Sequence, residues 1–214
     1  MRWSRVGLVL FWFGFLFKVM HWPLASFLLL VGAGTMVNTG VVAWARAEGP
    51  TRTARLLWLA IGVWHLYFLF RLQYWPGALM LQAGAAVIAV LALVQWSAQK
   101  LPVNVTMVLL VLCTLGGGLL YFVRAHRIFK NVSMLVRAPG YYDYRAWDKY
   151  SWFLYLDHKY DEALVAQDSA HSVAVRALAD HVIEADAVKE LQQHRQQVLD
   201  RSWKSYDFSD GSRR

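Results

Sequence analysis

The sequence contains one helical corner twice, and this repeat limits the folds open to the chain. Residues 15–33 read FLFKVMHWPLASFLLLVGA, and residues 68–86, 53 positions later, read FLFRLQYWPGALMLQAGAA. Proline lacks an amide hydrogen and disfavours a helical conformation in the residue before it. One helix should therefore end at each Trp-Pro pair, and another should begin with proline in its first turn. The repeat predicts two copies of one helical hairpin.

Several apolar segments are long enough to cross a bilayer core, which takes roughly 20 helical residues. They are residues 3–20, 23–44, 56–74, 76–95 and 102–122. All five prolines lie at or between the ends of these segments, as expected for helix boundaries. We therefore predict an all-α polytopic membrane protein with about five transmembrane helices. Its duplicated hairpins span residues 3–45 and 56–97, and a fifth helix spans residues 102–122.

The charges divide the chain into a membrane domain and a water-facing tail. Residues 1–123 contain eight Lys and Arg residues and a single acid, Glu48. Residues 124–214 contain 14 Lys and Arg residues and 13 acids. We predict a transmembrane domain at 1–123, a basic interfacial segment at 124–140 and a soluble helical tail at 141–214. The basic excess accompanies the membrane domain, so lipids rather than nucleic acid are the expected partner. Cys113 is the only cysteine, which excludes an internal disulfide.

The repeated corner keeps its positive charge, as Lys18 in the first copy and Arg71 in the second. Such a cation can reach lipid headgroups or bind the carbonyl groups at helix ends. Tryptophan is favoured where a membrane meets water. We expect a structural role for the whole corner motif: Lys18, His21, Trp22, Pro23, Arg71, Trp75 and Pro76.

The run FKVMHWP, followed by Ala25, Gly32 and Thr35, resembles the membrane hairpin of the GldL family, the ion-driven motor subunit of gliding motility and type IX secretion. The family pattern is FK-x-x-HWPGA, followed by Gly and Thr-Glu in the second helix. The second copy contributes the shorter match WPGA at residues 75–78. The resemblance implies a bacterial inner membrane protein with a cytoplasmic N-terminus. The family glutamate corresponds to Met36 here and to Ala89 in the second copy, and the family hairpin is single rather than duplicated.

The ionisable residues of the membrane domain give little support to catalysis. A proton-driven device usually needs an intramembrane carboxylate, and the only acid before residue 124 is Glu48, in a predicted loop. His65 is the most interior ionisable residue. It is either a core histidine or a group that binds a proton or ligand. We expect no catalytic residue, no metal site and no cofactor, because no motif for these chemistries occurs.

The fifth segment and its extension indicate contacts with other helices and with lipid. Gly116, Gly117 and Gly118 allow close helix approach, which predicts a packing or oligomer surface. Arg124, Arg127 and Lys130 alternate with aromatic and aliphatic residues, a pattern typical of a segment at anionic lipid headgroups.

The tail has the spacing of one tetratricopeptide-like unit, in which large side chains of one helix pack on alanines of the next. An ordinary amphipathic hairpin would show the same periodicity. The expected packing residues are Trp147, Tyr150, Leu154, Tyr160, Ala163 and Ala170. A further helix is predicted at residues 182–203.

Our leading hypothesis is a non-catalytic integral membrane subunit or scaffold that binds a partner protein through this tail, or a copy of itself through the tail and fifth helix. The alternative is an ion-conducting or motor component related to the GldL family. A membrane enzyme is the third hypothesis.

Overall fold

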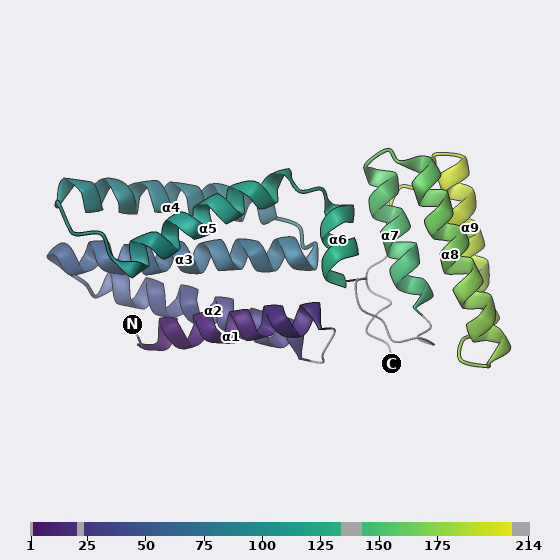
Figure 1. Ribbon diagram of the computed structural model, residues 1–214, viewed down its shortest axis with the longest axis horizontal. Helices are drawn as coiled ribbons and strands as arrows, with labels where there is room; N and C mark the ends of the chain where they lie inside the picture. The colour runs from purple at the N-terminus through teal and green to yellow at the C-terminus, as the bar shows by residue number, and fades with distance from the viewer. Residues whose placement is uncertain (1, 21–23, 134–142, 207–214) are drawn as a thin grey trace. The chain divides into compact units, whose positions relative to one another are not determined.

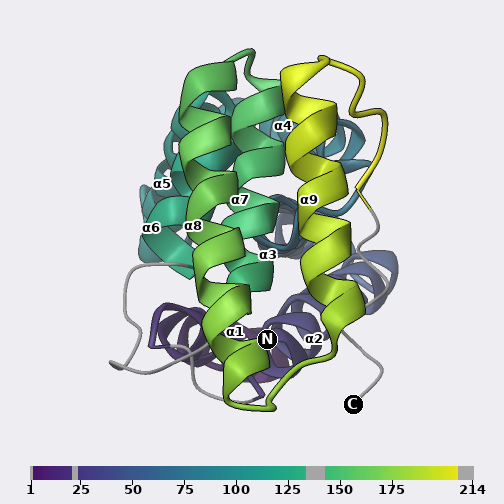
Figure 2. The same cartoon turned by 90° about the vertical axis from the view of Figure 1, so that its right-hand side faces the viewer.

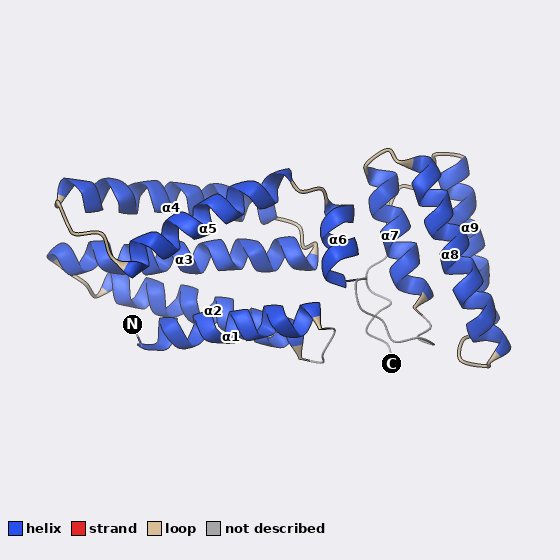
Figure 3. Cartoon of the chain, in the orientation of Figure 1, coloured by secondary structure: helices blue, strands red, loops and turns tan. Residues whose placement is uncertain are grey.

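The computed structural model describes residues 2–20, 24–133 and 143–206 of the 214-residue chain. Regular secondary structure in this part of the chain is helical throughout (Figure 3). The chain divides into two compact units, Met1–Val123 and Arg124–Arg214. The predicted all-α fold is confirmed, and each unit is described separately below.

The first unit is a bundle of five long helices lying side by side (Figure 1). They are α1 (Arg2–Val19), α2 (Ala25–Ala45), α3 (Gly49–Gln73), α4 (Ala78–Ala98) and α5 (Val105–Phe122). Helix α3 packs against each of the other four. Its side chains are buried on several faces, including those of Leu57, Ile61, Trp64 and Tyr67. Helix α3 is therefore the core helix of this unit.

Among the described residues of this unit, four helices are long and apolar enough to cross a membrane. They are α2, residues Thr51–Gln73 of α3, α4 and α5. This finding supports an integral membrane protein. The expected fifth crossing, α1, has 18 residues but contains Arg2, Arg5 and Lys18. Because α1 has no more than 18 residues, any crossing must include all three cations, whereas the longer α3 contains an 18-residue stretch with at most two charged residues. The crossing of α1 stays a prediction.

Cysteine labelling distinguishes five crossings from four. If α1 crosses, a cysteine replacing Arg2 and one replacing Glu48 should be labelled by an impermeant maleimide from the same side of sealed vesicles. A cysteine replacing Pro76 should be labelled only from the other side. Labelling of the Arg2 and Pro76 positions from one side would show that α1 does not cross. A Cys113→Ala background removes the buried native thiol.

The second helices of the two hairpins have matching bounds. Helices α2 and α4 each contain 21 residues, and their bounds are offset by 53 residues, the period of the sequence repeat. Each follows a residue in the left-handed region, Leu24 with φ 68° and Gly77 with φ 89°. Helix α3 begins at Gly49 rather than at the predicted residue 56, because Pro50 lies in its first turn, where a proline fits. The shared bounds support the duplication, which remains an inference from sequence.

The second unit contains α6 (Ala125–Ser133), α7 (Tyr144–Leu156), α8 (Tyr160–Ala179) and α9 (Ala185–Leu199). Helix α7 packs against α6, α8 and α9, and Figure 2 shows α7, α8 and α9 side by side. The predicted last helix, residues 182–203, is shorter at both ends. The described part of the predicted interfacial segment, residues 124–133, belongs to this unit. Residues 134–140 lie outside the described residues.

Candidate functional site

The corner residues are described only in part. His21, Trp22 and Pro23 lie outside the described residues. Lys18 is half-buried in the last turn of α1. In the second copy Trp75 is 40% exposed, and its ring meets the ring of Phe70 edge-on at 5.2 Å between centroids. The second corner therefore holds its tryptophan against the end of α3.

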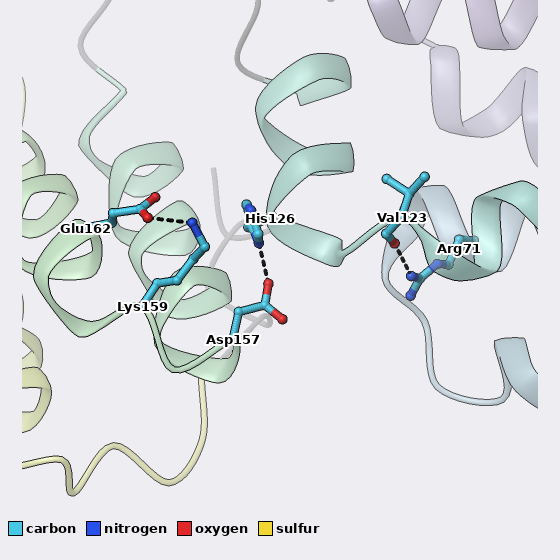
Figure 4. A network of polar contacts seen from close by, with 6 residues as sticks. All are labelled: Arg71, Val123, His126, Asp157, Lys159 and Glu162. Atoms are coloured by element: carbon cyan, nitrogen blue, oxygen red, sulfur yellow. Dashed lines mark hydrogen bonds and ion pairs between the residues drawn. The ribbon is translucent and has the colours of Figure 1, made fainter.

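Arg71 binds the end of another helix. Its Nη2 donates a hydrogen bond of 2.6 Å to the carbonyl oxygen of Val123, the residue that ends α5 (Figure 4). The last carbonyls of a helix lack partners within the helix and carry partial negative charge, so a guanidinium stabilises them. We expected the corner cation to bind helix-end carbonyls, and this one belongs to α5.

His65 lies in an aromatic environment at the centre of the bundle. The side chain is fully buried, and its ring meets those of Phe11 and Phe68 at centroid distances of 4.8 and 5.7 Å. Nδ1 lies 2.8 Å from the carbonyl oxygen of Ile61, which can only accept, so Nδ1 donates. The Nε2 atom has no hydrogen-bond partner among the described residues. His65 thus has one satisfied and one unsatisfied nitrogen.

Of the three predicted packing glycines, only Gly117 is buried against a neighbour. A methyl group added there would overlap the ring of Trp64, whereas one at Gly118 would meet no atom within 4 Å. The described residues also show a close approach of two backbones, those of α1 and α2. A Cβ atom added to Gly32 would lie 2.8 Å from the carbonyl oxygen of Gly7. We did not predict this seam, although Gly7 and Gly14, two turns apart in α1, were a signal for it.

Helix α6 separates basic from apolar residues. Arg124, Arg127 and Lys130, the predicted headgroup residues, are exposed. On the other side, the ring of Phe129 lies 5.4 Å from that of Phe153 in α7. His126 and Asp157 form an ion pair when the histidine is protonated (Figure 4). The apolar face of α6 therefore packs on protein, and only the basic face is open.

The predicted hairpin of the tail is present as α7 and α8. Ala163 and Ala170 of α8 are fully buried, as is Leu154 of α7, with 1% exposed. Ser151 Oγ donates a 2.8 Å hydrogen bond to the carbonyl oxygen of Ala163. Trp147 packs beside Ala170 in an apolar cluster, while Tyr150 and Tyr160 are half-buried. The large-on-small packing expected from the spacing occurs at this interface.

Sequence reasoning missed a polar cluster inside the tail. The carboxylate of Asp148, on α7, is 5% exposed and accepts a 2.5 Å hydrogen bond from Gln167 Nε2 on α8. It also lies 3.0 Å from Nδ1 of His194, on α9. The Tyr206 side chain hydrogen-bonds to the same carboxylate. One buried acid therefore joins three helices and the segment that follows them.

Aromatic rings cover this cluster. The Trp203 ring stacks on the His194 ring at 4.7 Å and meets the Trp152 ring at 5.0 Å. Burial, together with the charges of Asp148 and Glu190, raises the pKa of Tyr206. The segment after α9 is thus part of the core. The sequence contained a signal for this second contact face of α7. Asp148, Trp152 and Tyr155 have the spacing of residues that lie on one side of a helix.

The cluster predicts a pH-dependent stability for the tail. Burial alone would lower the pKa of His194, but the hydrogen bond and charge of Asp148, with Glu190, raise it above the ordinary value. Protonation of His194 is therefore favoured in the folded state, and its stabilising effect is fully present below the unfolded pKa of about 6.5. This stabilisation should be lost as pH rises through the folded pKa.

Thermal unfolding of the full-length protein in detergent, followed by tryptophan fluorescence from pH 5.5 to 8.5, measures this dependence. His194→Gln should flatten the profile, whereas replacing His171, on α8 outside this cluster, by Gln should leave it unchanged. A profile that is the same in the wild type and His194→Gln would contradict the assignment.

The fold and these clusters define an all-helical integral membrane protein with a second, separately packed helical unit. Comparisons with protein-family models, curated proteins and solved structures find no match. The resemblance to the GldL hairpin rests on the sequence motif alone. Within residues 2–20, 24–133 and 143–206, no group of three or more His, Cys, Asp or Glu side chains is placed to hold a metal ion.

Proposed function

We propose that the protein is a non-catalytic membrane subunit or scaffold whose C-terminal unit binds a partner protein. The observation that carries this proposal is the outer face of α8. Val165 and Val175 are 66% and 43% exposed there, although the opposite face of the helix is closed by buried alanines. The two valines lie ten residues apart, about 15 Å along the helix.

Acidic residues define the kind of partner that fits this face. Asp161, Glu162 and Asp168 are exposed near Val165. Asp168 already pairs with Arg195 on α9. Lys159 pairs with Glu162 and lowers the pKa of that carboxyl group (Figure 4). A partner segment with apolar side chains bordered by lysine or arginine would complement the surface.

Co-purification of the tagged full-length protein in mild detergent tests the proposal. Val165→Lys should remove a partner that the wild type retains, because it places a cation within the acidic, apolar face. Val182→Lys is the matched control, since Val182 is also about half exposed but lies after α8. Recovery of the same proteins with Val165→Lys would contradict this docking face, and recovery of none with the wild type would contradict the proposed function.

Anionic lipid is the second partner that we propose, and the exposed cations in α6 and directly before it support it. Arg124, Arg127 and Lys130 begin two residues after the end of α5, a helix long enough to cross the membrane. Cations so close to a span lie within reach of headgroups.

The alternative is an ion-conducting or motor component related to the GldL family. The unsatisfied Nε2 of His65 favours it, because an intramembrane ionisable group can carry protons. Reconstituted protein should show no proton flux above empty liposomes under the leading proposal. A flux that His65→Phe abolishes would support the alternative.

A further inference from the structure

The outward face of α2 contains one unsatisfied polar group. Asn38 is exposed, and its carboxamide makes no hydrogen bond to any described residue. Its exposed neighbours on this side of the helix include Leu30 and Val41, both apolar. Asn38 lies three residues beyond the middle of a 21-residue helix, a displacement of about 4.5 Å. If α2 crosses the membrane, this amide lies near the bilayer centre.

Lipid offers this carboxamide no partner. The hydrocarbon core contains neither donors nor acceptors, so an unpaired amide there is costly. The structure describes α4 and α5 throughout. Their outward faces differ from that of α2 in the position of their exposed polar side chains. Their exposed polar side chains, such as Gln95 and Tyr121, lie within one turn of a helix end, close to water. Among the exposed polar groups of α2, α4 and α5, Asn38 therefore has the strongest need for a protein partner.

We propose that this face of α2 binds a second copy of the same chain, with the two Asn38 carboxamides hydrogen-bonded to each other. An asparagine side chain has both a donor and an acceptor, so two of them related by a two-fold axis satisfy one another. Gly34, one turn earlier, leaves room for close approach. A Cβ atom added there would meet nothing within 4 Å, and small residues of this kind favour helix pairing in lipid.

The equivalent position of the second hairpin explains why a dimer forms rather than a larger array. Leu91 lies 53 residues after Asn38 and is 51% exposed on α4. The Leu91 side chain has no hydrogen-bonding group, so α4 lacks the carboxamide that selects a partner on α2. The interface is thus confined to one face of each chain and closes with two copies. This interface on α2 also differs from the oligomer surfaces expected from sequence, which are on α5 and the tail.

Energy transfer between donor- and acceptor-labelled full-length protein in phosphatidylcholine vesicles measures the association. Over a series of protein-to-lipid ratios, the wild type should dimerise and Asn38→Leu should weaken the association about 5- to 30-fold. Asn38→Gln, which keeps the amide, should retain most of it. Leu91→Ala is the matched control and should associate like the wild type. A wild type that stays monomeric at every ratio, or an Asn38→Leu variant that associates as tightly, would overturn the proposal.

Cross-linking locates the interface independently. In a Cys113→Ala background, a cysteine replacing Val41, one turn after Asn38, should form a disulfide-linked dimer on mild oxidation. A cysteine replacing Val90, which is also exposed but lies on α4, should remain monomeric. Cross-linking through the Val90 position and not through the Val41 position would place the contact on α4 and overturn the assignment to α2.

Discussion

Replacing Asp148 by alanine is expected to lower the free energy of unfolding of the C-terminal unit by about 3–5 kcal/mol, the usual effect of removing one partner of a buried charged pair. The substitution leaves Gln167 and His194 without their shared acceptor in a site closed by aromatic rings. Because Asp148 contacts two other helices, the loss should loosen the whole unit. Thermal unfolding of the full-length protein, with limited trypsin digestion of the tail, measures the change.

Asp168 provides the control for this substitution. It pairs with Arg195 at 2.7 Å, but both side chains are about half exposed. Solvent-exposed pairs contribute about 0–1 kcal/mol, so Asp168→Ala should change little. Equal effects of the two substitutions would show that the Asp148 cluster does not hold the helices together.

Replacing Gly32 by alanine is expected to destabilise the membrane unit by about 1–3 kcal/mol, the range for overpacking a closed interface. The added methyl group would lie 2.5 Å from the backbone nitrogen of Phe11 and 2.8 Å from the carbonyl oxygen of Gly7. Both atoms belong to the backbone of α1, so the helix itself must move away from α2.

Gly84→Ala in α4 is the matched control, because a methyl group there meets nothing within 4 Å. The midpoint of thermal unfolding in detergent should fall for Gly32→Ala and stay within error for Gly84→Ala. An unchanged midpoint for Gly32→Ala would refute the close contact between α1 and α2.

Local signals in the sequence predicted the elements of the fold well. Prolines and apolar length located the helices, and the 53-residue period matches the offset between α2 and α4. The tail hairpin followed from large residues spaced against Ala163 and Ala170. The start of α3 was predicted too late. Sequence alone does not distinguish a proline in the first turn of a helix, such as Pro50, from a proline in a loop.

The arrangement of the elements was harder to predict. A membrane helix is apolar toward lipid as well as toward protein, so hydropathy did not reveal that α3 is central. The sequence analysis predicted glycine packing at Gly116–Gly118, where Gly117 is buried against Trp64, but it missed the close approach of α1 and α2 at Gly7 and Gly32. Asp148 and His194 lie 46 residues apart, and only the packing of three helices brings them together. Distant polar pairs of this kind leave no periodic signal.

The bond between Arg71 and the end of α5 has a mechanical consequence. Val123 is the last residue of the first unit, so the chain leaves this bundle at the residue that Arg71 binds. Its carbonyl oxygen is tethered to α3, the helix that the other four surround. The exit point of the chain is thus held twice, by the backbone of α5 and by a side chain of α3.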